Sequence, residues 1–213
     1  MGITSDNALI IVLLIAILLS VFFYITPSGI QFTGKVIDKD AGTTTAIVAP
    51  TAYINFTTEK ISWGTGSLVD GTMGCKLNTI SATDNCTDFS AVNTPLVLEN
   101  VGNTNVRIQL VSNKNASAFI GGSGPRFQYR VAEKEGGSCL SNVGNVCNIF
   151  TPNNQTPKIF TNVNITGDGT TICPCLLARD ARDSLKIDVE VFVPYNTLTG
   201  QKSAVFTAIA TSL

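Results

Sequence analysis

The stretch Leu185-Lys-Ile-Asp-Val-Glu-Val-Phe-Val193 has an apolar residue at every second position and Lys, Asp or Glu at three of the positions between them. Side chains of a strand point alternately to the two faces of a sheet, so this pattern predicts a strand with one face in a core and the other in water. Pro194 ends the strand because proline cannot donate to the ladder. Gly200 then turns the chain, and residues 204–210 return as the last strand.

Other short stretches have strand character too. Asn100-Val-Gly-Asn103 separates two of them and predicts a turn between strands. At least seven such strands indicate a mainly β, antiparallel, immunoglobulin-like β-sandwich, and only residues 176–183 could form a short helix. The apolar residues of these stretches are Ile30, Phe32 and Val36; Ala52, Ile54 and Phe56; Leu96 and Leu98; Val106, Ile108 and Leu110; and Phe127, Tyr129 and Val131.

An uncharged apolar run occupies residues 8–25 and predicts one hydrophobic helix within residues 1–29. Eighteen helical residues span about 27 Å, close to the ~30 Å hydrocarbon core of a bilayer. The run lacks the basic start and the Ala-x-Ala site of a signal peptide, so we expect a retained transmembrane or filament-core helix. The alternative is cleavage near Ser28 or Gly29. In either case, we expect residues 30–213 to form one extracellular, disulfide-containing β-sandwich domain.

Two features of the sequence give opposite predictions for the side of the membrane on which this domain lies. Lys35 and Lys39 follow the apolar run, which favours the cytosol, but Asp38 and Asp40 offset them. Six cysteines in Gly-, Asn- and Thr-rich surroundings are typical of disulfides in an oxidising compartment. We give the cysteines more weight and expect the domain at the cell surface, with the N-terminus in the cytosol.

The cysteine spacing suggests two local pairs. Cys75 and Cys86 are eleven residues apart, a spacing that a hairpin can close, and we expect them to pair. Cys139 and Cys147 frame a Gly-Asn turn in the same way and are expected to pair with each other, the alternative being pairing with Cys173 or Cys175. The Cys173-Pro-Cys175 motif is CxC rather than CxxC, which favours structural disulfides over a redox or metal site.

Five Asn-x-Ser/Thr sequons agree with export and are candidates for glycosylation. Asn, Ser and Thr are so frequent in this chain that the excess over chance is small. The candidates are Asn55, Asn85, Asn115, Asn154 and Asn164.

Composition excludes several classes of chemistry. Charged residues are 14% of the chain and the net charge is −1, so no basic field would hold nucleic acid. There is no histidine, which excludes a His-based general base, a His-containing triad and a His-ligated metal. The Asp38-Lys-Asp-Ala-Gly42 stretch begins like a calcium loop but has Ala49 at the twelfth position, which favours a solvated turn. We therefore expect no cofactor and no enzymatic activity.

Two further features have a structural and a functional interpretation each. The charges at Arg179, Asp180, Arg182 and Asp183 predict a solvated face or local ion pairs, the alternative being a partner-binding cluster. Trp63 is expected to be a core or sheet-covering aromatic rather than a ligand-stacking platform.

Four segments resemble exported archaeal β-sandwich surface proteins. The Asn-x-Gly-Asn-x-x-Val turn at residues 100–106 is similar to one in archaeal surface-layer-like and pilin-like domains and in the camelysin/TasA group of biofilm fibre proteins. The resemblance covers roughly residues 50–212 and implies the fold and a surface or filament role. Archaeal pilins also begin with an apolar helix, but their basic leader is not found here. The segments are Tyr53-Ile-Asn-Phe-Thr-Thr58, Ile61-Ser-Trp-Gly64, residues 96–106 and residues 185–193.

Two functions fit these features. The first is a structural subunit of a pilus-like filament or surface coat that self-associates, with residues 8–25 in the membrane or in the filament core. The second is a membrane-tethered recognition or adhesion module whose loops, residues 113–125 and 136–157, contact a host, a neighbouring cell or a glycan. One Trp and four Tyr are few for a recognition surface, which favours the first.

A segment near the predicted helix is a candidate assembly strand. Ile30, Phe32 and Val36 alternate with polar residues, as in a strand that buries one face. Such a strand could add to the sheet edge of a neighbouring copy. The alternative is that it forms the first strand of its own domain.

Overall fold

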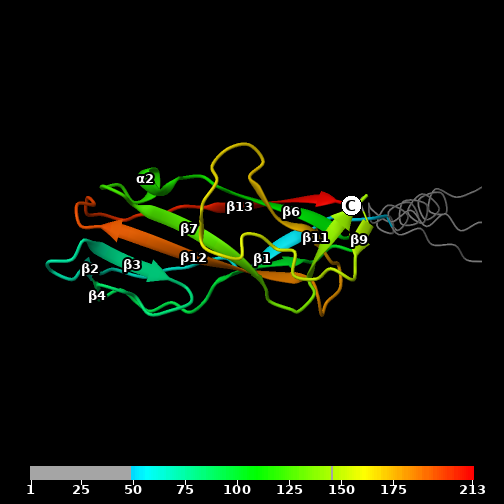
Figure 1. Ribbon diagram of the computed structural model, residues 1–213, viewed down its shortest axis with the longest axis horizontal. Coiled ribbons are helices and arrows are strands. Elements are labelled where there is room, and N and C mark those ends of the chain that lie inside the picture. Colours follow the sequence, from blue (N-terminus) through cyan, green and yellow to red (C-terminus); the bar gives the residue numbers. More distant parts are fainter. Residues whose placement is uncertain (1–48, 145) are drawn as a thin grey trace, which may run out of the picture. The chain divides into compact units, whose positions relative to one another are not determined.

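The computed structural model describes residues 49–144 and 146–213. The predicted apolar helix, the candidate assembly strand and the Asp38 loop lie outside these residues. Within them, the structure is mainly β with antiparallel sheets, as predicted, and none of their helices is long and apolar enough to cross a bilayer. Figure 1 shows the strands running along the long axis of the picture.

The strands form two large sheets and a small ribbon. In the first sheet the order is β1-β5-β12-β7-β10, with β3 also paired to β12; in the second it is β13-β6-β11-β8-β9; the ribbon is β2-β4. The first sheet contains β1 (Ile54–Thr58), β3 (Gly74–Asn78), β5 (Leu96–Asn100), β7 (Arg126–Glu133), β10 (Thr161–Asn162) and β12 (Ser184–Pro194). The second contains β6 (Val106–Ser112), β8 (Cys139–Val143), β9 (Val146–Asn148), β11 (Thr170–Leu176) and β13 (Phe206–Ser212). The ribbon contains β2 (Ser67–Leu68) and β4 (Cys86–Thr87).

Both large sheets contribute to one hydrophobic core. Leu98, Leu185 and Ile187 from the first sheet pack in the same cluster as Ile108 and Ile172 from the second. All five side chains are inaccessible to solvent. The alternating positions of the predicted strands therefore supply a common core between two sheets, the arrangement of a β-sandwich.

The strand β12 is the centre of the first sheet. It pairs with β7 along one side; on the other side its first half pairs with β5 and its second half with β3. Its predicted polar face is not uniformly solvated, because Asp188 is buried. The Thr79 hydroxyl donates to Asp188 Oδ1 at 3.0 Å, and Arg130 Nε donates to Asp188 Oδ2 at 3.0 Å. A buried carboxylate requires such partners, which the alternation pattern does not reveal.

The predicted turn at residues 100–106 connects the two sheets, because β5 belongs to the first and β6 to the second. The buried Asn100 side chain fixes this connection. Its Nδ2 donates to the carbonyl oxygens of Thr104 at 2.9 Å and Leu177 at 3.1 Å, and its Oδ1 accepts from the Gly102 amide at 3.1 Å. At Gly102, an added Cβ would lie 2.3 Å from the carbonyl oxygen of Thr51, so the close approach requires glycine.

Three disulfides engage all six cysteines. The predicted Cys75–Cys86 pair is present. The predicted pairing of Cys139 with Cys147 is wrong, because the structure joins Cys139 to Cys173 and Cys147 to Cys175. The β8–β9 hairpin does form, but its register puts Cys147 opposite Asn142 rather than opposite Cys139.

The helix considered for residues 176–183 is absent. Leu176 is the last residue of β11, and the Arg182 amide donates to the Arg179 carbonyl at 2.7 Å within an irregular turn. The short helix α2 (Ala116–Phe119) was not predicted. The sequence feature that favours this helix is local. Asn115 is the N-cap, and its side chain accepts a hydrogen bond from the Ala118 amide at 2.9 Å.

Candidate functional site

The described residues contain neither a metal-binding group of side chains nor a free thiol. In residues 49–144 and 146–213, no three His, Cys, Asp or Glu side chains are grouped so that they could hold a metal ion. The cysteines are not available as nucleophiles, because all six form disulfides. The Cys173-Pro-Cys175 motif is structural, as predicted.

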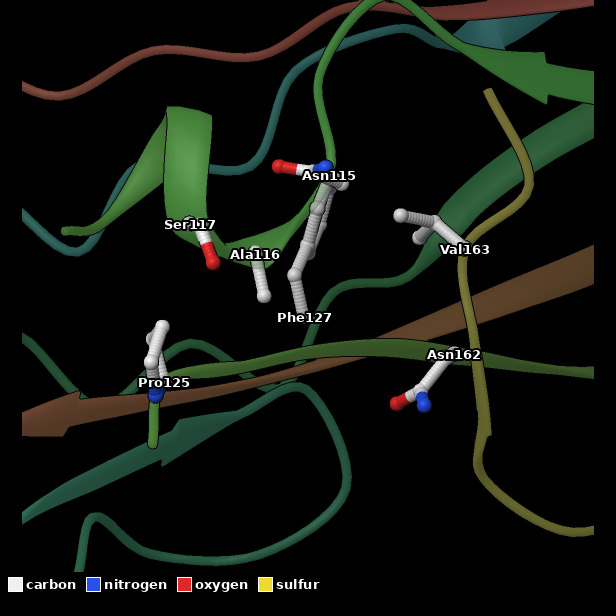
Figure 2. A pocket seen from close by; sticks show the side chains of 7 residues that line it. All are labelled: Asn115, Ala116, Ser117, Pro125, Phe127, Asn162 and Val163. Atoms are coloured by element: carbon white, nitrogen blue, oxygen red, sulfur yellow. The ribbon is translucent and has the colours of Figure 1, made fainter. Parts of the chain in front are cut away.

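One shallow pocket lies between α2, β7 and the segment around β10. Figure 2 shows Asn115 and Ser117 on one side and Asn162 and Val163 on the other, with Phe127 between them. The pocket has a volume of about 190 Å³ and no charged side chain lines it. Small-molecule sites usually occupy about 300–1,000 Å³, so this pocket is small for a ligand site.

A larger groove lies at the end of the domain where the β8–β9 hairpin meets the loop after β11. Its volume is about 380 Å³. The lining combines apolar, amide and cationic side chains and includes no carboxylate. We call it the arginine groove; its residues are Asn103, Thr104, Asn105, Leu140, Val146, Cys147, Ile149, Leu177, Ala178, Arg179 and Arg182.

The charged cluster at residues 179–183 is divided by the fold. Arg179, Asp180 and Arg182 are exposed, as predicted for a solvated face, whereas Asp183 is only 4% exposed. The predicted local ion pairs do not form, since the one ion pair among the described residues joins Arg130 to Asp188. The two arginines therefore present their charge to the groove and to solvent.

Asp183 lies among other carboxylates. Its amide donates to Glu135 Oε2 at 3.0 Å, and its buried Oδ1 has no hydrogen-bond partner within the described part of the chain. Burial, followed by the nearby charges of Glu135 and Glu99, raises the pKa of Asp183 to about 6. Asp183 therefore binds a proton more readily in the folded chain than in the unfolded one.

This shift predicts how stability depends on pH. Because the pKa of Asp183 is higher in the folded state than in the unfolded state, protonation of Asp183 stabilises the fold. This stabilisation is fully present below the unfolded-state pKa near 4 and is lost as pH rises through about 6. Asp183→Asn should remove this dependence and raise the free energy of unfolding at pH 7 by roughly 1–3 kcal/mol. Urea unfolding at several pH values measures it, with the exposed Asp180→Asn as the control. Equal pH dependence in wild type and Asp183→Asn would contradict the prediction.

The five sequons differ in accessibility. Asn55, Asn85 and Asn115 are exposed, whereas Asn154 and Asn164 are half-buried. Asn154 Nδ2 donates to the Thr151 and Pro152 carbonyl oxygens, and Asn164 Nδ2 donates to Thr170 Oγ1 at 3.4 Å. N-glycans attach to this nitrogen, so the folded domain presents three of the five acceptors.

Glycosylation of this chain should therefore be uneven. We expect glycans at the three exposed sequons and little or none at the two half-buried ones. Mass spectrometry of glycopeptides from surface-exposed material measures the occupancy of each site. Predominant modification of the two half-buried asparagines would contradict the expectation.

The free strand edges are the remaining candidates for a functional surface. In the described part of the chain, β13 pairs with β6 alone, and β1 pairs with β5 alone. The register of β1 shifts between Phe56 and Thr58, whereas β13 continues in register over seven residues. The strands β9 and β10 at the opposite edges have only three and two residues. The edge of β13 is therefore the longest regular one.

Trp63 has the predicted structural role. It packs, partly buried, against the cluster that contains Cys75, Leu77 and Phe127. The candidate assembly strand with Ile30, Phe32 and Val36 lies outside the described residues. Comparison with protein-family models, with curated proteins and with solved structures gives no match. The resemblance to exported archaeal surface proteins stays a prediction.

Proposed function

We propose that this chain is a non-enzymatic structural subunit of an extracellular filament or a cell-surface coat. The open edge of β13 is the observation that carries the proposal. Its sequence, Phe-Thr-Ala-Ile-Ala-Thr-Ser, contains no charge and no proline, and its pairing with β6 contains no bulge. Charges, prolines and bulges are the devices by which soluble sheets protect their edges from pairing with other chains. A strand edge without charges, prolines or bulges is open to pairing with a strand from another chain.

The strand order supports an immunoglobulin-like arrangement in which none of the described strands occupies the place beside β13. The order β1-β5-β12-β7 corresponds to strands A, B, E and D, and β13 beside β6 corresponds to F beside C. The chain passes from the first sheet to the second between β5 and β6 and between β12 and β13, as it does between B and C and between E and F, whereas β8–β11 have no counterpart between D and E. In the immunoglobulin fold, strand G pairs with F, and the corresponding place here is the outer edge of β13.

A strand from a neighbouring copy would occupy that place. The segment with Ile30, Phe32 and Val36 has the alternation that such a strand requires. Three disulfides favour an oxidising compartment and therefore the cell surface. The apolar run at residues 8–25 would hold the subunit in the membrane or form the filament core.

Phe32→Asp in the full-length chain tests the proposal. A charge on the buried face of the added strand should abolish polymers seen by negative-stain electron microscopy and leave the unfolding temperature of the unpolymerised subunit unchanged. Thr33→Asp is the matched control, because it places the same charge on the opposite face of the strand. Unchanged filaments would refute strand addition. A lower unfolding temperature without any change in assembly would show that the segment belongs to its own domain.

A membrane-tethered recognition module is the second candidate. The pocket in Figure 2 is formed in part by the loop of residues 113–125, which was predicted as a contact loop. Its Asn and Ser side chains could donate to glycan hydroxyls. The pocket is small and has no charged lining, so the structural-subunit proposal ranks first. Glycan-array binding by monomeric protein would favour the recognition module.

A further inference from the structure

We propose that the β8–β9 hairpin touches the surface of a lipid bilayer and inserts its apolar side chains among the lipids. This contact rests on the proposed function, in which the apolar run at residues 8–25 holds the subunit in the membrane before assembly. The hairpin end of the domain is then the face that the tethered subunit turns to the bilayer. We call the inserted residues the hairpin patch; they are Val143, Val146, Ile149 and Phe150.

The hairpin patch exposes four large apolar side chains to water. Val143 and Val146 are each 68% exposed, Ile149 is 67% exposed and Phe150 is 85% exposed. Val143 and Val146 are register partners, so their side chains lie on the same face of the hairpin. Exposed groups of apolar side chains mark contacts with another protein or with a membrane.

The hairpin presents these side chains from a fixed backbone. The Cys147–Cys175 disulfide joins β9 to β11. In the turn after β9, the Phe150 amide donates to Asn148 Oδ1 at 3.0 Å, and the Thr151 amide donates to the Asn148 carbonyl at 3.1 Å. An apolar tip that is already ordered loses little conformational entropy when it enters a bilayer interface.

The position of the tether identifies the bilayer as the occupant. The Thr51 carbonyl, near the start of the described domain, accepts from the Asn103 amide at 3.1 Å. Asn103 lines the same groove as Val146 and Ile149, so the chain enters the domain beside the hairpin patch. Residues 26–50 join this point to the apolar run and can span at most about 90 Å. Within this limit, contact with the bilayer is an intramolecular event that a high effective concentration favours.

The opposite end of the domain is apolar too, but it lies away from the tether. Met73 is 80% exposed and Leu198 is 81% exposed. Leu198 follows β12, whereas Arg182 of the arginine groove precedes it, and the eleven residues of this strand span roughly 35 Å. Figure 1 shows the β2–β3 and β12–β13 loops at one end and β9 with the C-terminus at the other. The far end therefore provides an internal control.

The charges near the hairpin predict the kind of lipid. Arg179 and Arg182 are exposed, but the exposed Asp180 lies between them. Asp183 follows, and its amide donates to Glu135 Oε2 at 3.0 Å. These carboxylates offset the arginines, so an anionic surface has no special attraction for this end. Because the contact depends on apolar area, zwitterionic lipid should suffice.

Phe150→Trp in full-length protein tests the contact. In phosphatidylcholine vesicles with brominated acyl chains, the introduced indole should lose roughly half or more of its emission, because interfacial elements bury about 5–10 Å into the headgroup and acyl boundary. Leu198→Trp is the matched control, since this side chain is equally exposed at the far end and should not be quenched. Wild-type protein gives the emission of Trp63, which is subtracted from both variants.

Two further readings identify what covers the patch. Blue-shifted emission without bromine quenching would show that protein covers Phe150, either a second copy or the apolar run, and would overturn the inference. Replacing part of the phosphatidylcholine by phosphatidylglycerol should leave the quenching unchanged. Quenching that requires the anionic lipid would contradict an apolar contact.

The remaining outcomes separate this contact from the filament function. An unshifted, unquenched indole at position 150, or equal quenching at position 198, would refute the contact. Filaments seen by electron microscopy in the same preparation would leave the proposed function standing. Full-length protein that does not enter the vesicles would refute the anchor and the contact together. Wild-type protein that never polymerises, with quenching at position 150 intact, would refute the filament function alone.

Discussion

Replacing Asn100 by alanine should lower the free energy of unfolding by about 2–4 kcal/mol. The side chain is only 2% exposed and binds three carbonyl oxygens and one amide. Alanine would leave the buried Leu176 and Leu177 carbonyls and the half-buried Thr104 carbonyl and Gly102 amide without this partner. Each fully buried group left unpaired costs about 1–3 kcal/mol, partly offset by relaxation. The connection between the two sheets depends on this one amide group.

Urea unfolding followed by the fluorescence of Trp63, the single tryptophan, measures the effect. Asn93→Ala is the matched control, because Asn93 is an exposed asparagine in the loop before β5 and its loss should cost less than about 0.5 kcal/mol. An Asn100→Ala variant as stable as this control would contradict the role assigned to the turn.

Removing the Cys139–Cys173 disulfide by a double alanine substitution should cost about 4 kcal/mol. The bond closes a loop with a sequence separation of 34 residues, and the chain-entropy relation gives nearly this value for such a loop. Both cysteines are inaccessible to solvent in the core between the sheets, so the lost sulfur atoms add a packing cost. This is the largest effect expected from any of the three disulfides.

The other two disulfides provide an internal comparison. Cys147–Cys175 spans 28 residues and is partly exposed, and Cys75–Cys86 spans 11 residues, for which about 3 kcal/mol is expected. When each pair is replaced by alanine, the loss in the free energy of unfolding should be largest for Cys139–Cys173, smaller for Cys147–Cys175 and smallest for Cys75–Cys86. Non-reducing peptide mapping checks the pairing. Recovery of a peptide that links Cys139 to Cys147 would contradict the structure.

Local patterns predicted the strands well, because a strand's exposure pattern repeats every two residues and can be read from its own sequence. The alternation in residues 185–193 corresponds to β12, and the stretches around Tyr129 and Ile108 correspond to β7 and β6. The Cys75–Cys86 disulfide was equally predictable, because β3 and β4 are close along the chain.

Pairing between distant segments was not predictable in this way. The motif Cys173-Pro-Cys175 suggests two thiols on one face, yet Cys173 belongs to the core between the sheets and Cys175 to a separate cluster with Leu140 and Leu177. The register of β11 shifts between Cys173 and Leu176, which separates the two side chains. Such a register shift depends on the neighbouring strands and cannot be inferred from the spacing of the cysteines in the sequence.

By itself, the sequence determined the antiparallel β character, most strand positions, the turn at residues 100–106 and the lack of histidine chemistry, because each depends on residue type or local spacing. Only the tertiary structure decided that β5 and β6 belong to different sheets, that Asp188 is buried with Arg130 and that Arg179 and Arg182 line a groove. These features arise where segments far apart in the chain meet. Such contacts are selected by the packing of the whole domain, and no local pattern encodes them.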